Sequence, residues 1–303
     1  MSTEEALTAA PSPAAETAAA SLAGRHTATR HLVRPHGGGV AALFGYSLIS
    51  SRRYFKVSAI SQLGGPVLYL LSLGIGLGSI VNARAGGQSL GTSYLSFIAP
   101  ALIAATALQV AVGESTYPIL FGGFKFQRLY YAMSATPLTA RQIAAGTLGW
   151  IAARSAFSAT LYLGVVACFG GIRSIGALLC VPIATLGAMA LAAPIATYSA
   201  TVETERGGFA AIFRFLVMPM FLFSGVFYPV SALPDWGRTL AWLSPLWHAT
   251  ELARWASLGS LRLSSGVGQL SAGAALAHLA FLTVLTVAGV LLASWRFQVR
   301  LSR

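Results

Sequence analysis

Charge is scarce in this chain: only 9% of its 303 residues are charged, and Asp plus Glu number 8. A soluble domain of this length carries far more polar surface, so the shortage of charge excludes that class. Hydrophobic residues make up 55% of the sequence, which predicts an integral membrane protein. No ten-residue segments of alternating hydrophobicity are seen, so the predicted spans are helices, which satisfy their own backbone groups.

Catalytic signatures are missing as well. The sequence has no paired carboxylates, no serine matched with histidine and aspartate, no HExxH zinc signature, and no glycine-rich loop ending in Lys-Ser/Thr. Without such a loop the chain has no visible means of hydrolysing ATP. If it drives active transport, a partner must supply the energy, and we expect this chain to bind no cofactor or metal.

Cysteine is nearly absent too, and the two thiols, Cys168 and Cys180, both lie within apolar runs without metal-ligand spacing. We interpret them as small buried apolar side chains that say little about redox compartment. The net charge of +12 does not predict nucleic-acid binding, because the arginines lie between apolar spans. With a cytoplasmic N-terminus, fifteen Lys and Arg fall inside and five outside, which predicts that both termini are cytoplasmic.

Long uncharged windows are the strongest positive signal. A membrane-spanning helix needs about 20 apolar residues, and six windows approach or exceed that length: Val57–Ala83, Ala85–Gly113, Ser155–Ile172, Ser174–Val202, Phe215–Pro234 and Leu263–Trp295. The third window is short unless its helix begins near Ile143. In that case Arg154 snorkels or faces the protein interior.

The N-terminal region reads as two segments. Residues 1–36 are rich in Ala, Ser, Thr and Pro and predict a disordered cytoplasmic tail, followed by a transmembrane domain over residues 37–303. In the segment 40–56, Phe44, Leu48 and Phe55 share one helical face. That pattern predicts an amphipathic helix along the inner membrane surface, although an ordinary basic flank to the first span fits equally well.

The stretch Phe213–Gly259 starts as a span and then breaks. We expect the fifth helix over Phe209–Tyr228, followed by two short helices over Pro229–Ser244 and Pro245–Leu258. The first carries Trp236, Leu240 and Leu243 at helical spacing, and the second carries Trp247, Leu252 and Trp255. Tryptophan prefers the headgroup level, so these pieces predict a re-entrant helical hairpin between the fifth and sixth spans. The fold class is therefore an all-α membrane protein with six transmembrane helices.

Polar residues in and after this stretch allow alternatives. Glu251 can pair with Arg254 at i,i+3, or it can face a substrate pathway. His278 is the one ionisable residue well inside the last window, and we favour a hydrogen bond to a neighbouring helix over a proton carrier. The set Asp235, His248 and Glu251 is the sole basis for a rival hypothesis, a membrane-embedded enzyme acting on lipid. A passive channel or lipid scaffold is a third possibility.

The cytoplasmic segment 115–147 mixes aromatic and basic residues. We expect a short helix over Phe124–Met133, with the chain leaving the helix by Pro137. Aromatic side chains of such a helix could enter a partner's cleft with basic ones at the rim, or the segment could be a simple interfacial belt. The candidate coupling residues are Phe124, Lys125, Phe126, Gln127, Arg128, Tyr130, Tyr131 and Met133, with Arg141 as a further basic group.

Two smaller signals concern packing. Gly74 and Gly78 lie four residues apart in the first window, a spacing that permits close approach of two membrane helices. Packing within one subunit is favoured over contact between subunits. The inner loop TVETERGGF, with Glu203, Glu205 and Arg206, is interpreted as a solvated turn in preference to a contact with the basic segment.

Three segments resemble the permeases of type-2 ABC exporters, especially the branch of nodulation-factor and daunorubicin-type exporters. They are YAMSATPL at Tyr131–Leu138, PMFLFSGVFYPVSALPDW at Pro219–Trp236 and LSPLWHATELAR at Leu243–Arg254. The similarity covers about residues 40–300, and the second and third segments together are quite specific. The N-terminal tail lies outside it.

The resemblance implies a multi-pass subunit of the bacterial plasma membrane with both termini in the cytoplasm. It implies two copies of an ATP-binding subunit, which bind ATP and Mg, and a second permease that is either a copy of this chain or a different one. The family's coupling helix corresponds to Phe124–Met133. Its external re-entrant helices correspond to Pro229–Leu258, which makes Trp236, Trp247, His248, Glu251 and Arg254 candidate gate residues.

Substrate identity does not follow from the resemblance. Members of the family move drugs, glycolipids, lipo-oligosaccharides or lipid-linked polysaccharides. The aromatic content and the closeness to the drug and lipo-oligosaccharide branch favour an amphipathic small molecule or glycolipid over a long polysaccharide.

Overall fold

The computed structural model describes residues 38–53, 55–80, 93–172, 174–258 and 270–302. Within these ranges the chain forms helices and connecting turns and no strand, as the all-α prediction requires. The expected tail over residues 1–36 and the expected outer loop over residues 82–92 lie outside the described residues. The same is true of Arg84, Arg173 and Arg262, so their predicted external positions stay predictions.

Four helical segments are long and apolar enough to cross a membrane: Tyr94–Lys125, Ala140–Cys168, Ile175–Thr201 and Ala272–Leu301. They correspond to four of the six predicted windows. The apolar helices in the first and fifth windows are shorter, Val67–Ile80 and Gly208–Phe223. Six spans therefore remain a prediction.

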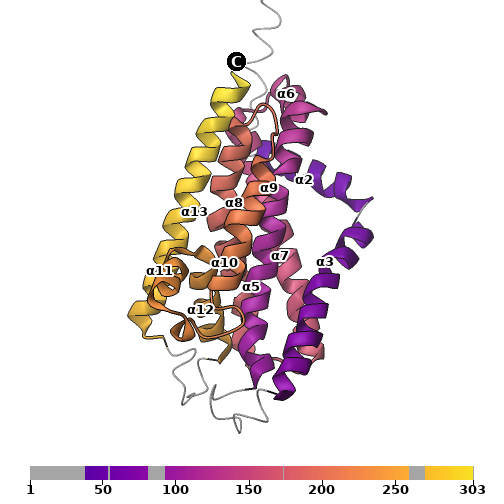
Figure 1. The fold of residues 1–303 in the computed structure, drawn as a ribbon. Helices are drawn as coiled ribbons and strands as arrows, with labels where there is room; N and C mark the ends of the chain where they lie inside the picture. The colour runs from indigo at the N-terminus through magenta and orange to yellow at the C-terminus, as the bar shows by residue number, and fades with distance from the viewer. Residues whose placement is uncertain (1–37, 54, 81–92, 173, 259–269, 303) are drawn as a thin grey trace, which may run out of the picture.

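The long helices lie side by side as a bundle (Figure 1). Its members are α5 (Tyr94–Ser115), α7 (Ala140–Cys168), α8 (Cys180–Thr201) and α13 (Ala272–Leu301). Helix α8 packs against the other three and against the short helix α12 (Pro245–Leu258). Helix α5 is apolar on all sides and buried along most of its length, as expected for a helix at the centre of a bundle.

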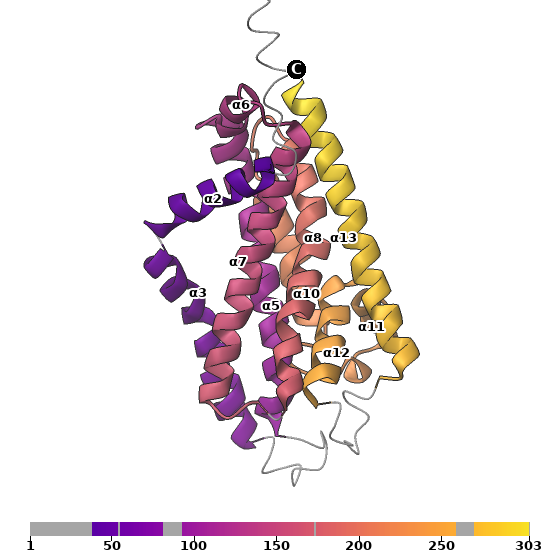
Figure 2. The same ribbon diagram turned by 180° about the vertical axis from the view of Figure 1, so that it is seen from behind.

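The N-terminal helices form a bent arm beside this bundle. Helix α2 (Gly38–Arg52) crosses α7 near the end of the molecule that carries the C-terminus, and α3 (Phe55–Tyr69) then runs along the flank into the π-helical segment η2 (Leu70–Leu77). Views from the front and from behind both show α2 and α3 meeting at an angle away from the bundle (Figures 1 and 2). We call α2 and α3 the arm.

Helix α2 contacts the bundle most closely through two residues that its sequence pattern did not single out. The buried residues of α2 are Gly39 and Leu43, whereas Leu48 is 49% exposed. A Cβ atom on Gly146 of α7 would come within 2.5 Å of Leu43, so these helices approach closely at that point. Of the predicted apolar face, Phe44 packs against Trp150 of α7 with ring centroids 5.8 Å apart, whereas Leu48 is turned away from the bundle.

Segment ends follow local backbone chemistry. Helix α7 begins with a capping box, in which the Thr139 hydroxyl accepts from the Gln142 amide and the Gln142 side chain accepts from the Thr139 amide. The fifth helical segment comprises α9 (Gly208–Ile212), η5 (Phe213–Val217) and α10 (Met218–Phe223). It ends earlier than the predicted Tyr228, because Gly225 adopts a left-handed conformation with φ of 70°.

The glycines of the first window pack within the subunit. A Cβ atom on Gly74 would come within 2.8 Å of Leu95, and one on Gly78 within 3.6 Å of Tyr94. Both neighbours belong to α5, and both glycines are buried. These contacts agree with the favoured interpretation, close packing inside one subunit, and the role of the two glycines between subunits stays a prediction.

Candidate functional site

The predicted coupling segment is not one helix. The π-helical segment η3 (Pro118–Lys125) continues the line of α5, the chain turns at residues 126–128, and α6 (Leu129–Ser134) follows. The predicted helix over Phe124–Met133 is thus wrong in its bounds. Arg128 has a φ of 48°, a left-handed conformation that is uncommon for a residue with a side chain. This turn separates Phe124 from Tyr130 and folds them back onto each other.

An aromatic cluster of Phe124, Tyr130 and Phe297 holds the turn. Their ring centroids lie 4.9 to 5.3 Å apart, and Phe297 comes from the last helix, α13. Phe124 and Tyr130 are only 3% and 6% exposed. They pack inside their own subunit, which corrects the expectation that these two rings insert into a partner.

Polar contacts reinforce the cluster. Burial raises the pKa of Tyr130 to about 12, so its hydroxyl stays neutral, and a hydrogen bond of 3.2 Å joins it to the Thr147 hydroxyl. Arg300 places its guanidinium 4.1 Å from the centre of the Phe124 ring and donates to the carbonyls of Ser199, Ala200 and Val202. A basic residue thereby caps the end of α8.

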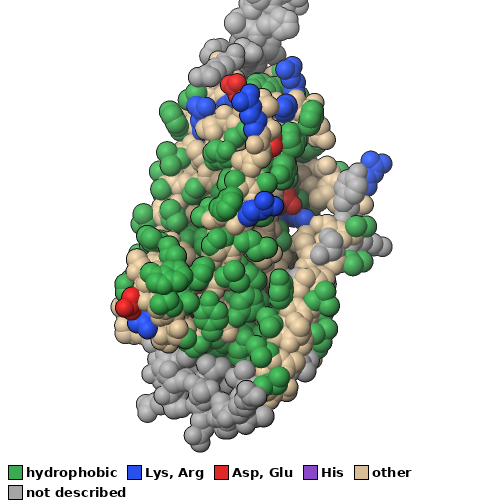
Figure 3. Space-filling model, viewed as in Figure 1, with side chains coloured by type: hydrophobic (Ala, Val, Ile, Leu, Met, Phe, Trp, Pro, Cys, Tyr) green, Lys and Arg blue, Asp and Glu red, His purple; other side chains and the backbone are tan. Residues whose placement is uncertain are grey.

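The turn itself is exposed. Phe126 is 73% exposed, its neighbours Lys125, Gln127 and Arg128 are also exposed, and Tyr131 is 37% exposed. Met133 packs partly against the core. Figure 3 shows basic side chains gathered at this end of the molecule, around α6 and the C-terminus. We call residues 125–128 the exposed turn.

A basic recess lies beside the exposed turn. It has a volume of about 610 Å³ and is lined by Phe124, Lys125, Arg128, Tyr131, Ala200, Thr201, Glu203, Arg296, Val299 and Arg300. Glu203 is exposed, as the predicted solvated turn requires, and it lines this recess together with Lys125 and Arg128 of the basic segment. Glu205 accepts a hydrogen bond from the Phe209 amide at 3.2 Å, where a carboxylate suits the start of α9.

At the other end, two short helices occupy the two predicted segments: α11 (Asp235–Leu243) and α12 (Pro245–Leu258). We call these helices, with the turn 224–234 before them, the outer cap. Trp236, Leu240 and Leu243 are 60%, 50% and 69% exposed, so α11 turns its apolar face outward. Helix α12 packs against α5, α8 and α13.

Arg254 is the structural centre of the outer cap, and it is only 1% exposed. It donates to Glu251 at 3.1 Å and to the carbonyls of Phe97, Gly225 and Val226 at 3.2, 2.6 and 3.3 Å. Its guanidinium also lies 3.8 Å from the centre of the Phe97 ring. One side chain therefore ties α12 to α5 and to the turn after α10.

This arrangement settles one prediction and changes another. The i,i+3 pairing of Glu251 with Arg254 is confirmed, since their nitrogen and oxygen lie 3.1 Å apart. Arg254 was expected at an external gate, yet it is buried in the protein. Sequence reasoning missed this role because an arginine between apolar segments reads equally well as a topology signal.

His278 has a histidine partner. Its Nδ1 lies 2.7 Å from Nδ1 of His248, and His248 Nε2 lies 2.9 Å from the Trp242 carbonyl. Because a carbonyl can only accept, Nε2 of neutral His248 carries the proton and His278 donates to its Nδ1. The rings of Trp247 and Phe281 flank the pair. The expected hydrogen bond to a neighbouring helix is confirmed.

The residues of the rival enzyme hypothesis are not assembled into a cluster. Asp235 is 98% exposed and pairs with Arg238 on the surface of α11, whereas Glu251 is held by Arg254. Across the described residues, no three His, Cys, Asp or Glu side chains come together as a metal-binding group.

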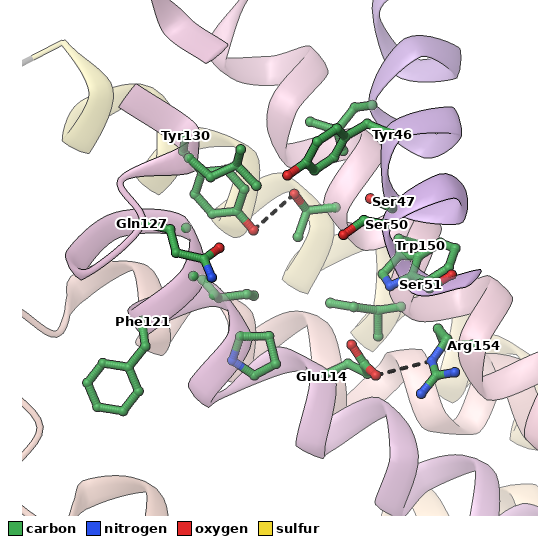
Figure 4. Close-up of a pocket in the computed structure, with 18 of the residues that line it drawn as sticks. Tyr46, Ser47, Ser50, Ser51, Glu114, Phe121, Gln127, Tyr130, Trp150 and Arg154 are labelled. Carbon is green, nitrogen blue, oxygen red and sulfur yellow. Dashed lines mark hydrogen bonds and ion pairs between the residues drawn. The ribbon is translucent and has the colours of Figure 1, made fainter. Parts of the chain in front are cut away.

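A third feature lies between the arm and the bundle. A cavity of about 590 Å³ is bordered by α2, the start of α3, the end of α5, η3, α6 and α7. At its base Arg154 pairs with Glu114 at 3.1 Å and donates to Ser58 at 2.7 Å (Figure 4). Of the two alternatives left open for Arg154, snorkelling or facing the interior, the structure shows the second. The cavity was not predicted, although opposite charges at the edges of two uncharged windows were a usable signal for the pair.

Comparison with known proteins identifies the relatives of this chain. Residues 39–258 match the family described as ABC-2 type transporter. Nodulation protein J of Rhizobium leguminosarum bv. viciae is 31% identical over 202 residues, which cover 67% of this chain and 75% of that protein. Nodulation protein J of Bradyrhizobium diazoefficiens is 29% identical over 70% of this chain and 79% of its own length.

A further relative is named as a transport permease. The inner membrane transport permease YadH of Escherichia coli K12 is 26% identical over 207 residues, which cover 66% of this chain and 77% of that protein. The family match extends from α2 to the end of α12 and so includes the exposed turn and the outer cap. The chain therefore belongs to the ABC-2 type transporter family.

Proposed function

We propose that this chain is the transmembrane permease subunit of an ATP-driven exporter. Its cargo is an amphipathic compound, such as a drug, an antibiotic, a glycolipid or a lipo-oligosaccharide, taken from the cytoplasm or the inner leaflet. Membership of the ABC-2 family supports a transport subunit that works with an ABC ATP-binding protein in the bacterial inner membrane. In this proposal the partner binds ATP and Mg, and two ATP-binding subunits serve this chain and a second permease.

The proposed topology has six spans over residues 37–303, both termini in the cytoplasm, and the outer cap on the external side. Its support is the distribution of side chains: hydrophobic groups cover the flanks of the molecule, and Lys and Arg gather at the end with the C-terminus (Figure 3). Cytoplasmic ends of membrane proteins are enriched in these residues. The exposed apolar residues of α11, including Trp236, support its re-entry into the outer leaflet.

One observation supports the proposed coupling site: the exposed turn, which has basic and aromatic side chains, is held in place by the buried aromatic cluster. Phe126 and Arg128 are exposed, while Phe124 and Tyr130 fix the backbone on both sides of them. A pre-organised turn loses little conformational entropy when a partner binds. The turn contacts α13 through Phe297, so a movement of the turn would be transmitted to the bundle.

The test is to purify the complex with its ATPase and to measure ATPase association and ATP-driven export. We expect Phe126→Ala and Arg128→Ala to weaken association and to uncouple export from hydrolysis, because both side chains are surface contacts of the proposed interface. Phe215→Ala is the matched control, since Phe215 is 76% exposed on η5 against 73% for Phe126. Unchanged association and export in both variants of the exposed turn would refute the coupling site.

A further inference from the structure

The cavity between the arm and the bundle has the size and the wall of a ligand-binding site. Its volume of about 590 Å³ falls within the range of small-molecule pockets, roughly 300–1,000 Å³. It opens between the arm and the bundle, so it lies inside one subunit. Under the proposed topology, on which this step rests, it lies near the inner leaflet.

Hydroxyl groups form one side of the cavity. Ser47, Ser50 and Ser51 lie three and four residues apart on α2, so they share one face of that helix, and Figure 4 shows them toward the space. Gln127 and Tyr130 lie across from them. A hydroxyl both donates and accepts, and an amide side chain offers both functions as well.

Aromatic rings supply the apolar part of the wall. Tyr46, Tyr117, Phe121 and Trp150 all line the cavity, and Tyr46 and Tyr117 are 45% and 41% exposed. The face of an aromatic ring carries partial negative charge, which attracts the C–H bonds of a ring packed against it. Trp150 is held in place by an edge contact with Phe44, at 5.8 Å between centroids.

The lining has no net charge. Its charged residues are Glu114 and Arg154, and each neutralises the other in an ion pair of 3.1 Å. Arg52 and Arg53 are exposed at the end of α2, between the two helices of the arm, and do not line the cavity. A cationic or anionic head placed beside this half-buried pair would compete with Arg154 or Glu114 for its partner, which weakens the pair. An uncharged head needs no such change.

We propose that this cavity binds the uncharged, hydroxyl-bearing head group of a membrane amphiphile, such as a sugar-bearing lipid. The head hydrogen-bonds to the serines of α2 and packs its ring against the aromatic wall. The lipid tail leaves through the opening between the arm and the bundle. The ligand is either cargo on its way to export or a resident membrane lipid.

The test uses the full chain in lipid nanodiscs that contain a photoactivatable glucosyl diacylglycerol or, in parallel, a photoactivatable phosphatidylglycerol. Mass spectrometry then locates the cross-links. We expect the glucosyl lipid to label α2 and η3 in preference to the anionic lipid. The double variant Ser47→Ala/Ser50→Ala should reduce that labelling by about tenfold, because each substitution removes a hydroxyl that hydrogen-bonds to the head group.

The control double variant is Ser72→Ala/Ser79→Ala. Both serines are exposed on the first apolar helix and bond to their own backbone, outside the cavity. Equal labelling by the anionic lipid, or labelling that survives Ser47→Ala/Ser50→Ala, would overturn the proposal. A melting temperature equal to that of the parent chain shows that loss of labelling is not loss of folding.

Addition of the ATPase partner and ATP separates the two sources. ATP-dependent loss of the label identifies cargo, and an unchanged label identifies a resident lipid. The experiment also distinguishes failure of the lipid-binding cavity from failure of the proposed exporter function. Export that depends on Phe126 without cavity labelling refutes the inference alone, and cavity labelling of a chain that recruits no ATPase refutes the exporter.

Discussion

Two ion pairs in the outer cap have the same i,i+3 spacing, but one is buried and the other is exposed. Comparing them tests how burial changes the contribution of an ion pair to stability. Arg254 is 1% exposed and pairs with Glu251, while Arg238 pairs with Asp235 on the surface. We expect Arg254→Met to destabilise the protein strongly. The matched change Arg238→Met should leave stability almost unchanged, because exposed ion pairs contribute little.

The magnitude follows from the partners that lose their donor. Arg254→Met leaves the Glu251 carboxylate and three backbone carbonyls without the guanidinium. Breaking a buried ion pair by removing one partner costs about 3–5 kcal/mol. At roughly 2–4 °C per kcal/mol, the melting temperature should fall by about 6 °C or more. The measurement is a thermal melt in detergent, followed by size-exclusion chromatography.

A double variant separates the charge from the carbonyls. Glu251→Gln/Arg254→Met removes the uncompensated carboxylate, so it should be more stable than Arg254→Met alone. It should remain less stable than the parent, since the carbonyls of Phe97, Gly225 and Val226 still lack a donor. Equal melting temperatures for Arg254→Met and Arg238→Met would show that this buried hydrogen-bond network does not hold the outer cap together.

Two further predictions concern the end of the molecule with the exposed turn. A Cβ atom on Gly123 would overlap the Tyr130 ring, whereas one on Gly122 would lie 3.8 Å from the Gln127 side chain. Gly123→Ala should therefore lower the melting temperature and ATPase association, while Gly122→Ala should not. Similar melts for both variants would contradict the close packing. At the base of the cavity, Glu114→Gln should lower the melting temperature because it leaves Arg154 without its carboxylate, and a melt equal to the parent's would show that the pair is dispensable.

Much of the fold could be predicted because hydrophobic length is a local property. The window Ser174–Val202 contains α8, and the window Ala85–Gly113 contains all but the last two residues of α5. Pro234 and Pro245 correctly marked the starts of α11 and α12, whereas the start predicted at Pro229 is six residues early. Boundaries that depend on backbone conformation were missed. The left-handed turn at Arg128 and the early end of the fifth segment have no hydropathy signal.

The site was less predictable, because burial of a polar residue depends on partners far away in sequence. Arg254 contacts the carbonyl of Phe97 and so lies against a residue 157 positions earlier. Phe124 and Tyr130 had the residue types of docking groups, but they pack against each other and against Phe297 of α13. Single-sequence patterns identify the polar and aromatic residues but not the neighbours that bury or expose them.

Helix α13 makes contact with both ends of the molecule. Phe297 packs in the aromatic cluster with Phe124 and Tyr130, and His278, 19 residues earlier, bonds to His248 of the outer cap. At 1.5 Å per residue these contacts lie about 28 Å apart on one continuous helix. Because α13 is a single helix from Ala272 to Leu301, we expect a shift of Phe297 along the helix axis to reach the histidine pair directly. The last helix is thus one continuous connection between the aromatic cluster and the outer cap.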